Sequence, residues 1–276
     1  MSGNERQIVY WNEVAGPKWI RVQEAMEARL SAIETLLLGR AAPRAGEAVL
    51  EVGCGTGTTT ARLADLVGEA GHVTAVDVSR PMLGAARSRL SGRSNVTLIE
   101  ADAAIAEFGG TFDLIASRFG VMFFTDPVAA FTHLHAALKP GGRLCCVAWA
   151  PIGANPHWAV PLGIAAARLG QPKPRVPHAA GPFAFDDADY VGDLLRKAGF
   201  SAVSVAAEPA TIMGRSLDDE ADVAAFMGPA GALLDEKQAD AATRADLRAA
   251  FREALPGYAD EKARVRATVH VIAARK

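Results

Sequence analysis

The chain of 276 residues has few cysteines, few aromatic residues, almost no net charge and no long hydrophobic run. Its three cysteines, Cys54 and the neighbours Cys145 and Cys146, fit neither a disulfide framework nor the spacing of a zinc site, so we expect reduced thiols. A formal charge of −2 argues against nucleic acid or an anionic membrane as partner. No apolar run approaches the roughly 18 residues of a membrane span. The polar N-terminus argues against a secretory signal, and we expect a cytoplasmic protein.

The stretch VLEVGCGTGTTTARLA, residues 49–64, organises the chain. Its apolar start predicts the end of a buried strand, and its second half has helical periodicity. Between them Gly53, Gly55 and Gly57 crowd one turn, where glycine lets the backbone approach a ligand and adopt positive φ. The helix N-terminus beyond the turn offers free N–H groups to an anionic group. Strand, glycine turn and helix together are typical of the nucleotide-binding unit of doubly wound α/β folds.

The first half of the chain alternates between apolar strand patterns and helical patterns. We expect a main N-terminal helix from about residue 18, after an interruption at Gly16-Pro17. Further strands are expected at 72–77, 96–100, 112–117 and 143–149, and helices after Ser79 and Asp126, which can serve as N-terminal caps. This alternation predicts a parallel sheet with helices on both faces.

The pattern changes after residue 150. Seven of the fifteen prolines lie between 151 and 185, where only 157–169 could hold a helix, and the apolar content argues for an ordered cap rather than disorder. A helix at 187–198, a strand at 200–206 and an acid-rich, solvated helical region at 217–255 follow. The alternating segment 266–274 predicts a final strand that could pair antiparallel at the edge of the sheet.

Two acidic residues narrow the choice of ligand. Asp77 follows the second strand at the position where a carboxylate binds a ribose diol, although it could also be a simple cap. Asp102 follows the third strand at the same edge and could accept from an adenine amine, or be a loop residue. Thr58 stands where a dinucleotide fingerprint has its third glycine, and the acidic Glu51 suits a cationic amino group better than a pyrophosphate.

The segments VLEVGCGTG, VTAVDVS, IEADAA, FDLIAS and LKPGGRL together resemble, in order, the signature segments of class I S-adenosylmethionine-dependent methyltransferases, closest to the small-molecule branch of ubiquinone and menaquinone biosynthesis. The resemblance covers about residues 45–150. It implies a Rossmann-like, doubly wound and mostly parallel seven-stranded sheet of order 3-2-1-4-5-7-6, with the last strand antiparallel. It also implies S-adenosyl-L-methionine as cofactor, bound by Glu51, Gly53, Cys54, Gly55, Gly57, Asp77, Val78, Met82, Asp102, Ala103 and Ser117.

With this resemblance we divide the chain into four parts. Residues 1–44 are expected to form a helical flap, 45–150 the cofactor-binding core, 151–186 the Pro-rich substrate cap, and 187–276 the rest of the sheet with a helical insertion at 216–262.

A methyl group on a sulfonium is already activated, so the protein mainly has to position the acceptor in line and exclude water. A general base is optional. We expect the acceptor near Trp11, Trp19, Phe119, Met122, Phe123 and Trp158, and a base or orienting group among His157, His178, Arg118 and Tyr10. His133 and His135 are expected to be structural.

The sequence after the fourth strand, Ser117-Arg118-Phe119-Gly120, has neither the carboxylates of metal-dependent catechol-type enzymes nor the Pro-Pro-aromatic motif of nucleic-acid amino-methyltransferases. We therefore expect metal-independent methylation of a small, apolar or aromatic molecule. The alternatives are a non-catalytic S-adenosylmethionine-binding module and a nicotinamide-dependent dehydrogenase. The acceptor, the methylated element and the oligomeric state, for which a homodimer is one option, stay open.

Overall fold

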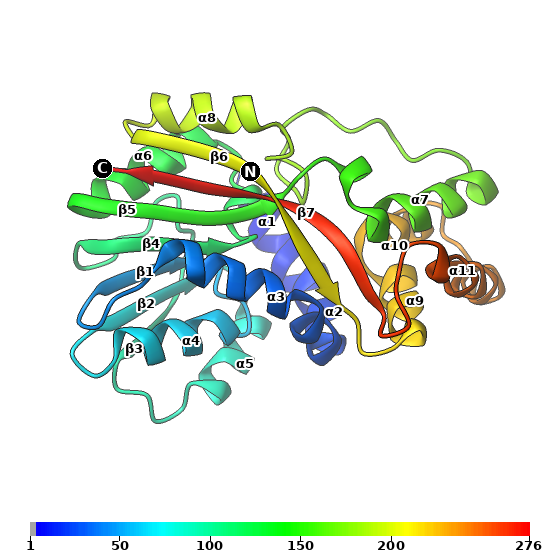
Figure 1. Ribbon diagram of the computed structural model, residues 1–276, viewed down its shortest axis with the longest axis horizontal. Coiled ribbons are helices and arrows are strands. Elements are labelled where there is room, and N and C mark those ends of the chain that lie inside the picture. The colour runs from blue at the N-terminus through cyan, green and yellow to red at the C-terminus, as the bar shows by residue number, and fades with distance from the viewer. Residues whose placement is uncertain (1–3) are drawn as a thin grey trace.

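The computed structural model describes residues 4–276 and contains one seven-stranded sheet of order β3-β2-β1-β4-β5-β7-β6 (Figure 1). The predicted fold class and strand order are therefore confirmed. β7 lies antiparallel between β5 and β6 rather than at the edge, which β6 occupies. The strands are β1 Ala48–Val52, β2 His72–Asp77, β3 Val96–Glu100, β4 Phe112–Arg118, β5 Leu138–Trp149, β6 Ser201–Met213 and β7 Arg264–Arg275.

Two strands are longer than the sequence predicts. β5 begins at Leu138 because residues 139–142 form an irregularity in its pairing with β4 rather than a separating loop. β6 runs on to Met213 because β7 pairs with it along its whole length. The turn residues near these positions predicted that the strands would break there, but hydrogen bonding to the neighbouring strands extends them.

Helices cover both faces of the sheet. α3 and α4 lie in front of the strands and α6 behind them, where it packs against α8 (Figure 1). The predicted cap at Asp126 is confirmed, since its carboxylate accepts from the N–H of Ala129 at 3.0 Å. These helices are α3 Gln23–Ala41, α4 Thr58–Val67, α5 Arg80–Arg89, α6 Pro127–Ala137 and α8 Ala188–Lys197.

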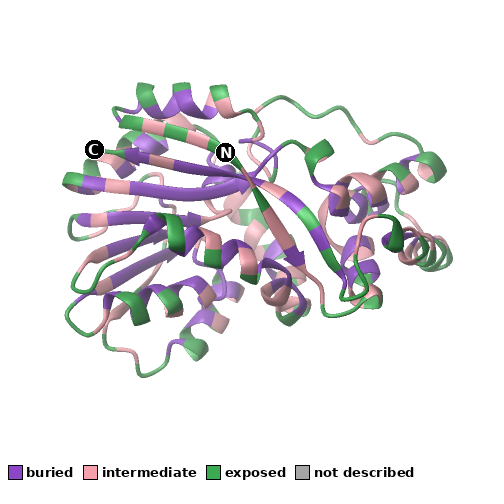
Figure 2. Ribbon diagram, in the orientation of Figure 1, coloured by how far each residue is buried: buried purple, intermediate pink, exposed green. Residues whose placement is uncertain are grey.

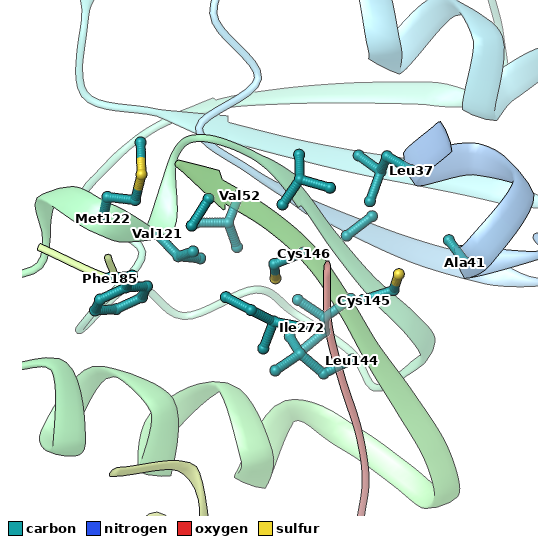
Figure 3. Packing of buried hydrophobic residues seen from close by; sticks show 14 of the residues in the cluster. Leu37, Ala41, Val52, Val121, Met122, Leu144, Cys145, Cys146, Phe185 and Ile272 are labelled. Atoms are coloured by element: carbon teal, nitrogen blue, oxygen red, sulfur yellow. The ribbon is translucent and has the colours of Figure 1, made fainter. Parts of the chain in front are cut away.

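The central strands are buried along almost their whole length, whereas their ends and the outer helix faces are exposed (Figure 2). Such strands read as continuous apolar runs because both faces are covered. Cys145 lies near Ala41 of α3, and Cys146 lies among Val121, Phe185 and other core side chains (Figure 3). Burial raises the pKa of Cys145 to about 12, so this thiol stays protonated and packs as a small apolar residue.

A second, smaller core joins four helices at one end of the sheet (Figure 1). They are α7 Pro156–Leu169, α9 Leu217–Phe226, α10 Gly228–Glu236 and α11 Ala241–Ala254. The predicted solvated face is wrong for one residue of this region. Glu220 is only 3% exposed, because it faces inward and forms an ion pair with Arg29 of α3.

The N-terminal segment is helical earlier than the sequence predicts. α1 Glu5–Tyr10, a π-helix at Trp11–Ala15 and α2 Gly16–Arg21 precede α3. Pro17 lies in the first turn of α2, where its missing N–H costs nothing, so it begins a helix instead of interrupting one. The break falls at Val22. We call residues 4–21 the strap. Within residues 4–276 no helix combines the length and the apolar character needed to cross a membrane.

Candidate functional site

The carboxylate of Asp77 is fixed at the end of β2 by two backbone N–H groups. Its Oδ2 accepts from Gly55 at 2.7 Å and its Oδ1 accepts from Ser79 at 2.9 Å. Burial raises the pKa of Asp77, and the two N–H bonds oppose that rise. Each carboxylate oxygen can accept further hydrogen bonds, so the pair suits a diol that donates two.

The three glycines of the turn have φ of +71°, +56° and +79°, a conformation that strains other residues. Each also faces a protein neighbour. A Cβ on Gly53 would lie 2.6 Å from the Cα of Gly120, and one on Gly55 would lie 2.9 Å from Cε of Met82. The sequence explains these glycines by the approach of a ligand. The structure adds a second reason, because the turn packs tightly against the loop after β4 and against α5.

Glu51 lies under the glycine turn and is 1% exposed. It accepts from the hydroxyl of Thr60 at 2.5 Å, and burial raises its pKa to about 8. The nearby Arg118 lowers it by a smaller amount. A cationic group next to this carboxyl would favour its ionised form.

Arg118, the last residue of β4, has no carboxylate within salt-bridge distance among residues 4–276. Burial lowers the pKa of this guanidinium, and Glu34, Glu51 and Glu27 act in the opposite direction. These carboxylates of α3 and β1 therefore favour its charged form without an ion pair, which leaves its N–H groups able to meet an anionic group of a ligand.

The strap is tied to the carboxyl ends of the strands at two points. At one end Asn4 donates to Oδ2 of Asp102 and accepts from the backbone N–H of Thr125 at 3.3 Å. Near its middle Asn12 donates to the carbonyl of Val78 at 2.8 Å and accepts from the N–H of Arg80 at 2.9 Å. These bonds place the strap across the edge where the ribose and adenine residues were predicted.

Ser79 has a different role from the one predicted. Its side chain makes no capping bond to α5, and its hydroxyl donates to the carbonyl of Trp11 at 3.0 Å. The Trp11 ring meets Phe123 edge-on at 5.0 Å. The strap therefore also touches the segment after β4, where the acceptor was predicted.

Three other predicted cofactor residues are buried apolar side chains. Met82, Ala103 and Cys54 are buried, with 5%, 6% and 5% exposure. The hydroxyl of Ser117 is used inside the protein, since it donates to the carbonyl of Val52 at 2.7 Å and accepts from Gly120 N–H at 3.1 Å. Ser117 therefore links the end of β1 to the loop after β4.

Two of the predicted acceptor residues, Phe119 and Trp158, belong to one connected aromatic group beyond β4 and β5. Phe119 has a strained φ of +66° and stacks on Trp149, with ring centroids 4.4 Å apart. Trp149 meets His157 at 5.2 Å and Trp158 at 5.8 Å. Trp149 was not among the predicted acceptor residues, although its place at the end of a predicted strand is a signal for such a role.

The remaining candidates lie in different surroundings. His178 stacks on Tyr190 at 3.8 Å. Tyr10 is 47% exposed on the strap, Trp19 packs against the core from α2, and Met122 is buried after β4. The prediction for His133 is confirmed, since its Nε2 lies 2.8 Å from the carbonyl of Ala106.

Several site residues gave no signal in the sequence. Asn4, Asn12, Arg29 and Glu220 are common residue types in helical segments, and their roles depend on partners up to 191 residues away. Among the residues that the structure describes, no group of three His, Cys, Asp or Glu side chains is placed to hold a metal ion.

Residues 49–142 match the family model of a methyltransferase domain. Over 105 residues the chain is 40% identical to the ubiquinone/menaquinone biosynthesis C-methyltransferase UbiE of Teredinibacter turnerae, an alignment that covers 37% of this chain and 42% of that protein. The chain thus spans less than half the length of this curated relative.

Two solved structures share the fold. One is a putative methyltransferase from Bacillus halodurans, with a TM-score of 0.56 and 20% identity over 88% of this chain and 98% of that one. The other is Haemonchus contortus phosphoethanolamine N-methyltransferase 2 with S-adenosylhomocysteine, with a TM-score of 0.60 and 17% identity over 98% of this chain and 60% of that one. Residues 49–142 are therefore similar to a methyltransferase domain, and the strand order is the one that the resemblance of the sequence segments implies.

Proposed function

We propose that this protein transfers the methyl group of S-adenosylmethionine to a small, apolar or aromatic molecule by in-line displacement, without a metal. The observation that carries the proposal is the Asp77 carboxylate, fixed by the N–H groups of Gly55 and Ser79 at the end of β2. A carboxylate held in this place, beside a glycine turn, is the arrangement that binds a ribose diol in doubly wound folds.

The other residues around Asp77 fit the rest of the cofactor. The buried Oε1 of Gln7, on the strap, has no hydrogen-bond partner among the described residues and could accept from the adenine amine. Asp102 could do the same after exchanging its bond to Asn4. At the methionine end, the buried carboxyl of Glu51 suits the amino group, and the guanidinium of Arg118 suits the carboxylate.

S-adenosylmethionine supplies a methyl group that its positive sulfur has already activated. The protein therefore has to hold the acceptor at attack distance, align it and keep water out. The strap, with Trp11 against Phe123, covers one side of this space. Phe119 and Trp149, at the ends of β4 and β5, offer an apolar surface on the other.

The identity of the acceptor does not carry over from the relatives. UbiE is named for quinone biosynthesis, but the family match ends at residue 142. Trp149, His157 and Trp158, which lie on the acceptor side in our proposal, come after that point. The flap, the cap, the homodimer and the cytoplasmic location stay predictions.

The proposal is tested by calorimetric titration of S-adenosylhomocysteine into Asp77→Asn. We expect an affinity about 10- to 100-fold weaker, because the ribose loses charge-assisted hydrogen bonds. Asp113→Asn is the matched control: this carboxylate also accepts a backbone N–H, from Ala48 at 2.9 Å, but at the start of β4 on the opposite edge of the sheet.

Equal affinities in both folded variants would overturn the assignment of Asp77. A rise in melting temperature with NADH but not with S-adenosylmethionine would instead indicate the dehydrogenase, because a ligand stabilises the folded state that binds it. If S-adenosylmethionine binds but its methyl group never reaches any acceptor, the protein is a binding module.

A further inference from the structure

Four buried polar atoms without a hydrogen-bond partner among residues 4–276 gather where the sheet meets the helices of the second core. They are both ring nitrogens of His157, Nε1 of Trp158 and Oε1 of Glu220. The three residues are 3%, 8% and 3% exposed. A polar group buried in this way costs free energy unless something bonds to it, so a cluster of them indicates a place built to meet a polar ligand.

The contacts between these side chains form one continuous group. The rings of His157 and Trp158 lie 4.5 Å apart, and the guanidinium of Arg29 lies 5.9 Å from the Trp158 ring. Arg29 forms its ion pair with the other carboxylate oxygen of Glu220. Pro161 lies inside α7 and has no N–H, so it does not donate the usual helical hydrogen bond to the carbonyl of residue 157.

This group adjoins the proposed methyl-transfer site. Trp149, the last residue of β5, contacts His157 on one side and stacks on Phe119 on the other. Phe119 precedes Gly120, which packs against Gly53 of the glycine turn. The path from the turn to His157 therefore runs along the carboxyl ends of neighbouring parallel strands, the edge where ligands of this fold bind.

The charges around the group cancel. Arg29 and Glu220 neutralise each other, and burial together with Arg29 lowers the pKa of His157 well below its ordinary value, so this imidazole is neutral. Burial also raises the pKa of the neighbouring Tyr258 to about 12, so its hydroxyl keeps its proton. An anion would find no unpaired cation here, whereas a neutral donor and acceptor would find partners.

We propose that His157, Trp158 and Glu220 form the polar wall of the acceptor site, and that the acceptor is an uncharged ring compound with a hydroxyl group. This proposal rests on the function proposed above. The hydroxyl donates to the imidazole of His157, and its oxygen accepts from the indole N–H of Trp158. Trp149 and Phe119 contact the ring. His157 thereby sets which edge of the acceptor faces the methyl group.

The test uses three probes of one shape: 2-naphthol, 2-methylnaphthalene and 2-naphthoate. Each is titrated by calorimetry into the protein saturated with S-adenosylhomocysteine. We expect 2-naphthol to bind at least about fivefold more tightly than the other two, the effect of one additional net hydrogen bond. His157→Phe keeps a ring in place and should abolish this preference, and His157→Gln, which can still accept, should keep part of it.

His135→Phe is the matched control, because this imidazole lies outside the group and meets Phe200 edge-on, with ring centroids 4.9 Å apart. It should leave the preference unchanged. A preference that survives His157→Phe, tightest binding of 2-naphthoate, or no binding of 2-naphthol overturns the proposal. If S-adenosylhomocysteine does not bind the wild-type protein, the proposed function is overturned instead. The three probes are then titrated into the protein without S-adenosylhomocysteine, and the same order of affinities tests the polar wall.

Discussion

Replacing Gly53 by alanine separates two costs that the glycine turn combines. The residue has φ +71°, where an L side chain is strained by roughly 1–2 kcal/mol. The new Cβ would also lie 2.6 Å from the backbone of Gly120, too close for any real contact. Because neither backbone can move without shifting β1 or the loop after β4, we add an overpacking cost of roughly 1–3 kcal/mol. The expected loss of unfolding free energy is about 2–5 kcal/mol.

Two further glycines isolate these terms. Gly92 has φ +82° and no atom within 4 Å of the place that a Cβ would occupy, so Gly92→Ala should cost only the strain of roughly 1–2 kcal/mol. Gly84 lies in α5 with open space around it, so Gly84→Ala should stabilise the protein by about 0.5–1 kcal/mol.

Urea unfolding followed by tryptophan fluorescence measures the free energy of unfolding of all three variants. Calorimetric titration measures their affinity for S-adenosylhomocysteine, which reports on the geometry of the turn. We expect weaker binding only for Gly53→Ala, because only that change displaces the turn. If Gly53→Ala and Gly92→Ala lose the same free energy of unfolding, the close approach of β1 to the loop after β4 adds no overpacking cost, which would refute this explanation.

Three other changes test the interior. Burial raises the folded-state pKa of Glu51 from 4.5 to about 8, so between these pH values the folded protein keeps a proton that the unfolded chain has lost. The free energy of unfolding therefore falls as the pH rises from about 4.5 to 8. Glu51→Gln removes this titration, so its melting temperature should depend less on pH over that range than that of the wild type. Arg29→Leu should cost about 3–5 kcal/mol by leaving Glu220 unpaired, and the double variant with Glu220→Leu should recover most of it; equal losses on urea unfolding would contradict this. Asn12→Ala should speed the dissociation of S-adenosylhomocysteine severalfold in stopped-flow measurements by loosening the strap, and an unchanged rate would argue against its role as a cover.

Much of the sheet follows from local patterns. β2 ends where its apolar run ends, at Asp77, because a strand buried on both faces needs a continuous apolar sequence. The glycine turn and Asp77 are close in sequence to the strands that position them, so their spacing alone predicts their meeting. The strand order came from the resemblance of residues 45–150 and not from periodicity, which says nothing about which strands are neighbours.

What the sequence determined by itself is the cofactor half of the proposed site, because a strand, a tight turn and a helix N-terminus are set by neighbouring residues. What only the tertiary structure decided is the surroundings of the proposed acceptor half and of the strap. Asn4 meets Asp102, and Arg29 meets Glu220 across 191 positions, through side chains whose types are ordinary on helix surfaces. His157 becomes a buried, neutral imidazole only because α7 packs it against Trp149. Burial and charge at such positions depend on contacts between distant segments, which no local pattern records.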